Sequence, residues 1–147
     1  LEYYNDPKAT ESAFVDGWYK TGDLLKVGEN GYMYFLHRLK DMIKVGGENV
    51  SAREVEDVCR TVPGIDDIAV VAKSHEMLDM VPVVFVIRTE TAEPEAIMSE
   101  AIIAACRSVL ADFKVPRAVY FVEEFPLAEL GKISKKDLRE LADSFEA

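Results

Sequence analysis

The sequence predicts an α+β fold, in which a small domain with a three-stranded sheet flanked by helices follows a β-hairpin. Segments with strand-like apolar runs alternate with segments that have helical periodicity, and helix start signals separate them. The length of 147 residues suits one domain, with at most a fragment of a second. Hydrophobic residues make up 49% of the chain, which is enough for a real core.

The N-terminal part is predicted to hold a short helix and the hairpin. Asp6 is a suitable N-cap and Pro7 suits the first helical position, so the helix spans about 7–14. The hairpin strands are expected at 21–27 and 32–38, because turn residues rich in Gly and Asn separate two apolar runs.

The rest of the chain alternates helices and strands. Ser51 and Glu54 form an S-x-x-E capping box, and Ser134 caps a final helix. Apolar residues at helical spacing, among them Ile97 and Val109, predict a long amphipathic helix between these two. The expected elements are a helix over 52–61, strands over 65–72 and 81–87, a helix over 94–110, a strand over 118–122 and a helix over 134–144.

The charge distribution favours a small phosphorylated ligand over nucleic acid. The net charge is −10, from 17 basic and 27 acidic residues, whereas general nucleic-acid binding needs a basic field. The basic residues form two local patches, one of Arg38, Lys40 and Lys44 and one of Lys132, Lys135, Lys136 and Arg139. Such a patch could bind the ligand or could be a solvated face, and for Lys136 and Arg139 the two interpretations carry equal weight.

Cysteine, histidine and hydropathy exclude several classes of protein. Cys59 and Cys106 lie in apolar helical patterns, which indicates reduced core residues of a cytoplasmic protein and neither a disulfide nor a metal site. His37 and His75 are too few and too isolated for a zinc site. The longest apolar run, 81–87, is far shorter than the ~18 residues that span a membrane, and no signal peptide is expected.

The segment RLKDMIKVGGENVS at 38–51 combines three cations, a double glycine and a helix start. Cations beside a flexible glycine turn suit a site that grips phosphates and also moves. Taken alone, the segment is equally well an ordinary strand-turn-helix junction, since Gly-Gly before a capped helix is common turn chemistry.

Two further segments, YKTGD at 19–23 and PLAELGKISK at 126–135, flank this one in sequence. Together the three resemble the last blocks of the adenylate-forming superfamily, which includes acyl- and aryl-CoA synthetases, nonribosomal peptide adenylation domains and luciferases. The resemblance covers about residues 1–141. The string MIKVGGENVS is especially similar to crotonobetaine/carnitine-CoA ligases and fatty-acid-type CoA ligases.

The resemblance implies a domain division near Lys40. Residues 1–39, with the hairpin, would be the tail end of a larger N-terminal adenylating domain, and residues 40–147 would be the mobile C-terminal domain. The chain would then be a segment of a longer protein, and the apolar residues of its first part would lack their partner surface.

The same resemblance implies that Lys132 is the adenylation lysine. It lies in a loop before a helix, where functional side chains are often found, and an ammonium group there would stabilise the charge that develops on the α-phosphate. The alternative is a surface lysine at a helix start, a place where the dipole does not favour a cation. The family usually has threonine where Ala128 stands and a small residue where Leu130 stands.

For the nucleotide, the resemblance implies that Asp23 binds the ribose diol and that Arg38 makes a second contact near it. Their alternatives are an aspartate satisfied by nearby backbone amides and a surface arginine at a strand end. Lys40 matches the hinge about which the C-terminal domain of the family rotates between half-reactions. His37 departs from the Gly or Asp that commonly precedes the arginine.

For CoA, the resemblance implies that Gly46 and Gly47 line the pantetheine tunnel after the rotation. Only glycine lets the backbone approach a thin thiol arm so closely. Lys44 is implied as a residue used in the second half-reaction. A simple turn at the two glycines is compatible with this role.

The sequence therefore predicts the C-terminal part of an ATP-dependent acid–CoA ligase, inactive by itself. The whole enzyme would convert a carboxylic acid, ATP and CoA to acyl-CoA, AMP and pyrophosphate through an acyl-adenylate, with the N-terminal adenylating domain as its partner. Mg²⁺ is implied by ATP chemistry, although no ligands for it are evident here. One alternative is an adenylation domain that loads a carrier protein. Another is a stand-alone binding module, because no phosphate-cradling glycine-rich loop occurs.

Overall fold

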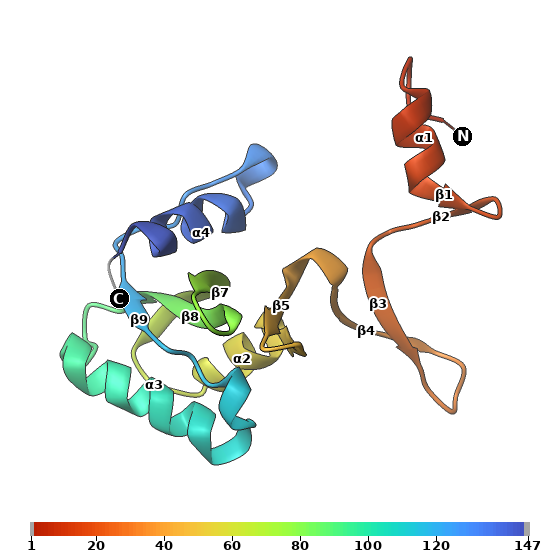
Figure 1. Cartoon of the computed structure of the whole chain (residues 1–147). Coiled ribbons are helices and arrows are strands. Elements are labelled where there is room, and N and C mark those ends of the chain that lie inside the picture. Colours follow the sequence, from red (N-terminus) through yellow and green to blue (C-terminus); the bar gives the residue numbers. More distant parts are fainter. Residues whose placement is uncertain (1, 146–147) are drawn as a thin grey trace. The chain divides into compact units, whose positions relative to one another are not determined.

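The computed structural model describes residues 2–145, which divide into two compact units (Figure 1). One unit runs up to Lys40 and the other begins at Asp41. The assignment of residues 1–39 to a preceding adenylating domain stays a prediction.

The N-terminal unit holds one helix and two small antiparallel ladders. The side chain of Asp6 caps the helix by accepting a hydrogen bond from the Ala9 N–H at 2.9 Å, and Pro7 is its first residue. This agrees with the predicted start. The elements are α1 (Pro7–Ala13), β1 (Phe14–Val15) paired with β2 (Trp18–Tyr19), and β3 (Asp23–Val27) paired with β4 (Met33–Arg38).

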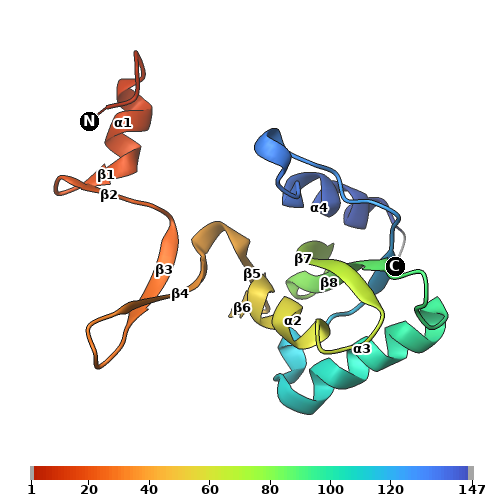
Figure 2. The ribbon, with the colours of Figure 1, turned by 180° about the vertical axis from the view of Figure 1, so that it is seen from behind.

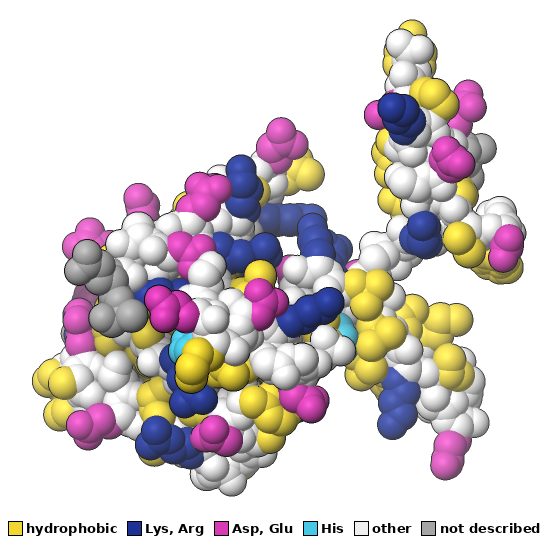
Figure 3. All heavy atoms as spheres, in the orientation of Figure 1, with side chains coloured by type: hydrophobic (Ala, Val, Ile, Leu, Met, Phe, Trp, Pro, Cys, Tyr) yellow, Lys and Arg dark blue, Asp and Glu magenta, His cyan; other side chains and the backbone are white. Residues whose placement is uncertain are grey.

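The N-terminal unit has no core of its own, since none of residues 2–40 is fully buried. Its apolar side chains are instead exposed, with Trp18 at 79% and Tyr32 and Met33 each at 70%. Figure 3 shows hydrophobic side chains over much of the surface of the β3–β4 hairpin. An exposed apolar surface of this kind marks a site of contact with another protein surface.

The C-terminal unit contains most of the regular structure and all of the buried core. The Leu39–Asp41 turn, which connects the N-terminal unit to this one, is a 3-10 helix, and two more such turns occur later, at Asp112–Lys114 and Glu129–Gly131. The elements are β5 (Met42–Val45), β6 (Glu48–Ser51), α2 (Ala52–Cys59), β7 (Ile65–His75), β8 (Asp79–Arg88), α3 (Glu95–Val109), β9 (Val119–Phe121) and α4 (Lys135–Ser144).

The sheet of this unit has five strands in the order β6-β5-β8-β7, with β9 parallel to β8. The α+β class is confirmed, but the sheet is larger than the predicted three strands, because β5 and β6 form an additional hairpin. That hairpin joins β8 at the single register pair Val45 and Asp79. Its strands have only four residues each and carry polar residues such as Lys44 and Asn49, so they gave a weak strand signal.

Helices cover both faces of the sheet. Val84 and Val86 of β8 pack with α2 and α3, whereas Val83 and Phe85 on the opposite face pack with α4. Figures 1 and 2 show α4 on one side of β7 and β8 and the other two helices on the other side. Because β8 is buried on both faces, its sequence is a continuous apolar run instead of an alternating one.

The buried face of α3 differs from the predicted stripe. Met98, Ile102 and Cys106 are the buried residues, at a spacing of four, while Ile97 and Val109 are 53% and 68% exposed. Helical spacing therefore identified the helix correctly and placed two residues on the wrong face.

Cys59 of α2 and Cys106 of α3 meet in the core with their sulfur atoms 3.5 Å apart. Both are free thiols and both are fully buried, which confirms the prediction that they are core residues. The hydrogen bond from the neighbouring sulfur, together with burial, raises the pKa of the Cys59 thiol. The Cys59 thiolate, the form in which a cysteine acts as a nucleophile, is therefore disfavoured.

Two leucines test how far the α4 face of the sheet depends on one side chain. Leu138→Ala removes a fully buried group of α4 and should lower the free energy of unfolding by about 2–5 kcal/mol through lost burial and the cavity left behind. Leu130→Ala is the same change at a side chain that is 93% exposed, and should alter stability by less than about 0.5 kcal/mol. Urea unfolding of both variants checks this, and equal losses would contradict the packing described here.

Candidate functional site

Lys132 lies on a short loop that is closed by backbone hydrogen bonds. The Ala128 N–H donates to the Lys132 carbonyl at 2.7 Å, and the Ser134 N–H donates to the Pro126 carbonyl at 2.7 Å. The loop therefore resembles a small hairpin whose two ends are held together just before α4. This geometry restricts where the lysine backbone can lie.

The tip of this loop has a strained backbone. Leu130 has φ 64° and ψ 23°, and Gly131 has φ 70°. Glycine accepts the left-handed region without penalty, whereas an L-residue such as leucine loses roughly 1–2 kcal/mol there. Such strain is retained where the surroundings determine the conformation, and it is common at functional loops.

The Lys132 side chain is exposed and, within residues 2–145, has no recorded hydrogen bond or ion pair. Its neighbours differ. Lys135 forms an ion pair with Glu56 at 2.8 Å, and Lys136 lies 3.7 Å from Glu140, four residues along the same helix. Lys132 is therefore the lysine of this patch that is available to an incoming anion.

Gly46 and Gly47 form the two-residue turn between β5 and β6, with Val45 and Glu48 as the flanking pair. Their φ values are 57° and 92°, so both need the left-handed region. Two consecutive residues with positive φ are typical of the tight turns that join twisted strands. A Cβ on Gly47 would have no heavy atom within 4 Å, so this side of the turn is open.

The glycine turn is held from behind by the turn between β7 and β8. The Gly46 N–H donates to the Leu78 carbonyl at 2.9 Å, and a Cβ on Gly46 would lie 3.2 Å from a Leu78 methyl carbon. That second turn is itself ordered by His75, whose Nδ1 accepts hydrogen bonds from the N–H groups of Met77 and Leu78 at 3.2 and 3.3 Å. The two turns therefore support each other.

Lys44 lies on β5 directly before the glycine turn, in register with Asn49. Its side chain is exposed, while its neighbours Ile43 and Val45 point into the core. The alternation of the strand therefore places the cation on the solvent face, close in sequence to the turn.

The structure brings Asp23 and Arg38 together in the N-terminal unit. They are a register pair of β3 and β4, and Arg38 Nε donates to Asp23 Oδ1 at 3.1 Å. The Asp23 N–H donates to Thr21 Oγ1 at 3.1 Å. Arg38 contacts only Oδ1 of the carboxylate, and within residues 2–145 no hydrogen bond to Oδ2 is found. The pair is partly exposed, with side chains 26% and 47% accessible for Asp23 and Arg38.

Lys40 is exposed and is the last residue of the N-terminal unit. It lies in the 3-10 turn Leu39–Asp41, so the two units meet within a single short turn. In the same turn the Leu39 N–H donates to the Gly22 carbonyl at 2.8 Å, which holds the first residue of the turn to the N-terminal unit.

Within the C-terminal unit, the Lys132 loop and the glycine turn belong to different places. Figures 1 and 2 show the segment before α4 apart from the β5–β6 hairpin. The sequence did not single out Glu56, which binds Lys135 next to the loop. The sequence feature that could have drawn attention to Glu56 is its position as an acidic residue two places after the capping Glu54.

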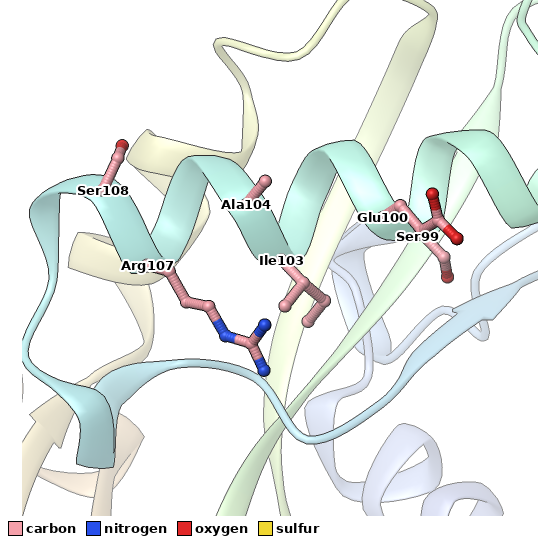
Figure 4. A pocket seen from close by; sticks show the side chains of 6 residues that line it. All are labelled: Ser99, Glu100, Ile103, Ala104, Arg107 and Ser108. Carbon is pink, nitrogen blue, oxygen red and sulfur yellow. The ribbon is translucent and has the colours of Figure 1, made fainter.

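The hollow on the surface of α3 does not contain any of the predicted site residues. This shallow hollow lies along α3, and all of its lining residues, which include Glu100 and Arg107, come from that one helix (Figure 4). In the part of the chain that the structure describes, no group of three or more His, Cys, Asp or Glu is placed to hold a metal ion. No described helix combines the length and the apolarity required to cross a bilayer.

A protein-family comparison matches residues 54–132 to the AMP-binding enzyme C-terminal domain, which is just over half of the chain and ends at Lys132. The chain belongs to this family. This identification confirms the resemblance to adenylate-forming enzymes. As an AMP-binding enzyme C-terminal domain, the chain is expected to match one part of larger proteins.

Curated relatives of this AMP-binding enzyme domain include CoA ligases. The chain is 40% identical to long-chain-fatty-acid–CoA ligase FadD13 of Mycobacterium tuberculosis, over 95% of this chain and 27% of that protein. It is 36% identical to 2-succinylbenzoate–CoA ligase of Listeria monocytogenes, over 94% of this chain and 28% of the relative. It thus spans about a quarter of the length of these relatives.

A solved structure supports the same assignment. ATP-bound MatB from Rhodopseudomonas palustris matches with a TM-score of 0.87 and 33% identity, over 97% of this chain and 28% of that one. At this identity the likeness extends beyond the fold to the family.

Alanine at the two glycines tests the backbone geometry of the β5–β6 turn. Both substitutions should lower the free energy of unfolding by about 1–2 kcal/mol, because each puts an L-residue in the left-handed region. Gly46→Ala should cost more than Gly47→Ala, since only its Cβ meets Leu78. The control is Lys44→Ala on the same hairpin, with an expected change below about 0.5 kcal/mol. Chemical denaturation measures all three, and a neutral Gly46→Ala would contradict the turn.

Proposed function

We propose that this chain is the C-terminal part of an ATP-dependent acid–CoA ligase and that Lys132 is its adenylation lysine. The observation that carries the proposal is an exposed lysine that has no side-chain partner among residues 2–145, on a loop closed by two backbone hydrogen bonds, in a domain whose relatives include CoA ligases. The relatives act on different acids, a long-chain fatty acid and 2-succinylbenzoate, so the acid itself is left open.

In the proposed first half-reaction, a carboxylate oxygen of the acid attacks the α-phosphorus of ATP. The P–O bond to pyrophosphate breaks, and an acyl-adenylate forms. Negative charge increases around the α-phosphate as the new bond forms, and the Lys132 ammonium would stabilise that charge and orient the carboxylate. Since Lys132 has no ion-pair partner among residues 2–145, no such bond within this part of the chain has to break before it reaches the phosphate.

In the proposed second half-reaction, the CoA thiol gives up its proton to solvent and its sulfur attacks the acyl carbonyl. The bond between the acyl carbon and the phosphate oxygen then breaks, and AMP leaves. The open side of Gly47 would let the pantetheine arm approach the backbone, and Gly46 would line the same tunnel. Lys44, exposed on the adjoining strand, is placed to contact an anionic group of the cofactor.

The separate places of the Lys132 loop and the glycine turn motivate a rotation of the domain between half-reactions (Figures 1 and 2). Each half-reaction needs a different part of this unit at the reacting atoms. Lys40 is the proposed hinge, because the units meet within one short exposed turn and a hinge needs only a few backbone dihedrals to change.

For the nucleotide, we propose that the ribose diol binds Asp23 and that Arg38 contacts the nucleotide beside it. The two side chains are bonded to each other here, but an exposed ion pair of this kind stabilises a protein by only about 0–1 kcal/mol. Exchanging that bond for hydroxyl groups of the ribose is therefore a small change in free energy.

The remaining parts of the proposed active site would come from an N-terminal adenylating domain. That domain would cover the exposed apolar side chains of residues 2–40 and would hold the acid and most of the ATP contacts. Mg²⁺ accompanies ATP in such reactions and would neutralise phosphate charge. No ligand for it is assigned to this chain, which we expect to be inactive by itself.

Lys132→Ala in the intact ligase tests the assignment. The rate of adenylation, followed as pyrophosphate release, should fall by at least about 100-fold, because a charge-stabilising group is lost from the transition state. Thioester formation from supplied acyl-adenylate should continue at nearly the wild-type rate. The matched control is Lys136→Ala, an exposed lysine of the same patch, which should leave both half-reactions unchanged. Equal loss of both half-reactions in Lys132→Ala would refute the role.

The reaction class is tested by pyrophosphate release from ATP with a panel of carboxylic acids, with and without CoA. Release that depends on an acid, with thioester appearing only when CoA is present, supports the CoA ligase. Release without a CoA thioester would instead indicate loading of a carrier protein or another use of the adenylate. No release with any acid, in a folded protein, would support the binding-module alternative.

A further inference from the structure

We propose that Glu56 and Lys135 are a positioning pair that sets the place of the Lys132 loop for the adenylation step. This inference rests on the proposed role of Lys132. Neither residue would touch the substrate, so both would act through the loop.

The pair is short and unusually sheltered for this molecule. Lys135 Nζ lies 2.8 Å from Glu56 Oε1, with side chains 25% and 14% accessible for the lysine and the glutamate. Among the ion pairs of residues 2–145, Glu56 is the least exposed acidic partner. A partly buried charged hydrogen bond fixes geometry better than the exposed pairs around it, because water competes less with it.

Glu56 is itself held in place from a second direction. The same Oε1 atom accepts a hydrogen bond from the Val70 N–H of β7 at 2.9 Å. Since β7 lies at the edge of the sheet, this backbone donor has no strand partner on that side. One carboxylate of α2 therefore connects a strand of the sheet to the first residue of α4.

Lys135 transmits this constraint to the loop. It is the first residue of α4 and lies three positions after Lys132. Ser134 between them is buried, caps the helix and closes the loop through its bond to Pro126. On the other side the loop begins after the buried Phe125, so both ends of the loop are anchored.

The sign of the charge supports a specific role for Glu56. A cation at the first position of a helix is disfavoured by the helix dipole, which prefers a negative charge there. Lys135 is nevertheless present and three-quarters buried, so its partner must offset this cost. Without Glu56, the start of α4 would tend to fray, and the loop attached to it would become less well defined.

The far end of α4 is anchored independently. Asp143 accepts a hydrogen bond from the Ser74 N–H at 2.9 Å, and Lys73 Nζ donates to the Phe145 carbonyl at 2.7 Å. Between the two ends, Leu138 and Ala142 are fully buried against the sheet. Loss of the Glu56–Lys135 pair should therefore disturb the loop end of the helix while the remainder stays docked.

The test uses Glu56→Gln and Lys135→Met in the intact ligase. Both should lower kcat for adenylation by about 10- to 100-fold, as expected for a displaced catalytic group, with KM for ATP little changed. Thioester formation from supplied acyl-adenylate should be unaffected. The double variant should be no worse than the more impaired single variant, because both changes remove one interaction. Lys135→Arg, which keeps the charge, should retain most of the activity.

Two matched controls separate positioning from general damage. Lys136→Met removes the neighbouring exposed lysine, and Asp143→Asn weakens the anchor at the other end of α4. Both should adenylate at nearly the wild-type rate. If Asp143→Asn lost as much adenylation as Glu56→Gln, or if Glu56→Gln lost both half-reactions equally, the pair would be merely structural and the inference would be overturned. Should Glu56→Gln fail to fold, Lys135→Met and Lys135→Arg carry the same test.

Lys132→Ala, measured alongside, distinguishes the two levels of the proposal. If it adenylates normally, the proposed function of Lys132 fails. If it is inactive in adenylation while Glu56→Gln and Lys135→Met keep the wild-type kcat, the role of Lys132 stands and the positioning pair is refuted. In a Lys132→Ala background, a positioning pair predicts no further loss from Glu56→Gln.

Discussion

Burial of β8 on both faces is the constraint on which the C-terminal unit depends. All six residues from 81 to 86 are buried, and alternate side chains belong to two separate cores. One core needs α2 and α3, and the other needs α4. Because α4 must cover the second face, the loop before it is delivered to the same side of the sheet, with Lys132 at its end. Apolar packing thus brings Lys132 to this side of the sheet, and the Glu56–Lys135 ion pair adds a polar contact at the start of α4.

Electrostatics then decide which lysine is available. The chain carries an excess of acidic residues, and most of its cations near α4 have partners. Lys135 pairs with a sheltered carboxylate and Lys136 lies near an exposed one, while Lys132 is exposed and has no ion-pair partner among residues 2–145. Beside the glycine turn, burial distinguishes Lys44 from its neighbours, because Lys44 is exposed whereas Ile43 and Val45 lie in the core. Position along the chain does not separate these lysines, but their surroundings do.

Helix caps and apolar runs predicted most of the elements, because both signals are local. The β5–β6 hairpin was missed since its strands are short and its place in the sheet depends on Val45 meeting Asp79, far along the chain. In the candidate site, Lys132 and the glycines were singled out through ordered motifs, and their roles stay predictions. Glu56 was not singled out, because its partner Lys135 is 79 residues away and only the packing of α2 and α4 around β7 brings them together.

The bond between the Gly46 N–H and the Leu78 carbonyl has a consequence for sequence variation. Surface turns between strands usually tolerate insertions and deletions. The turn after His75 is different, because one added residue would shift the carbonyl that receives this bond and the methyl group that lies against the glycine. Relatives that keep the double glycine should therefore keep the length of the His75–Leu78 turn as well, even where its side chains differ.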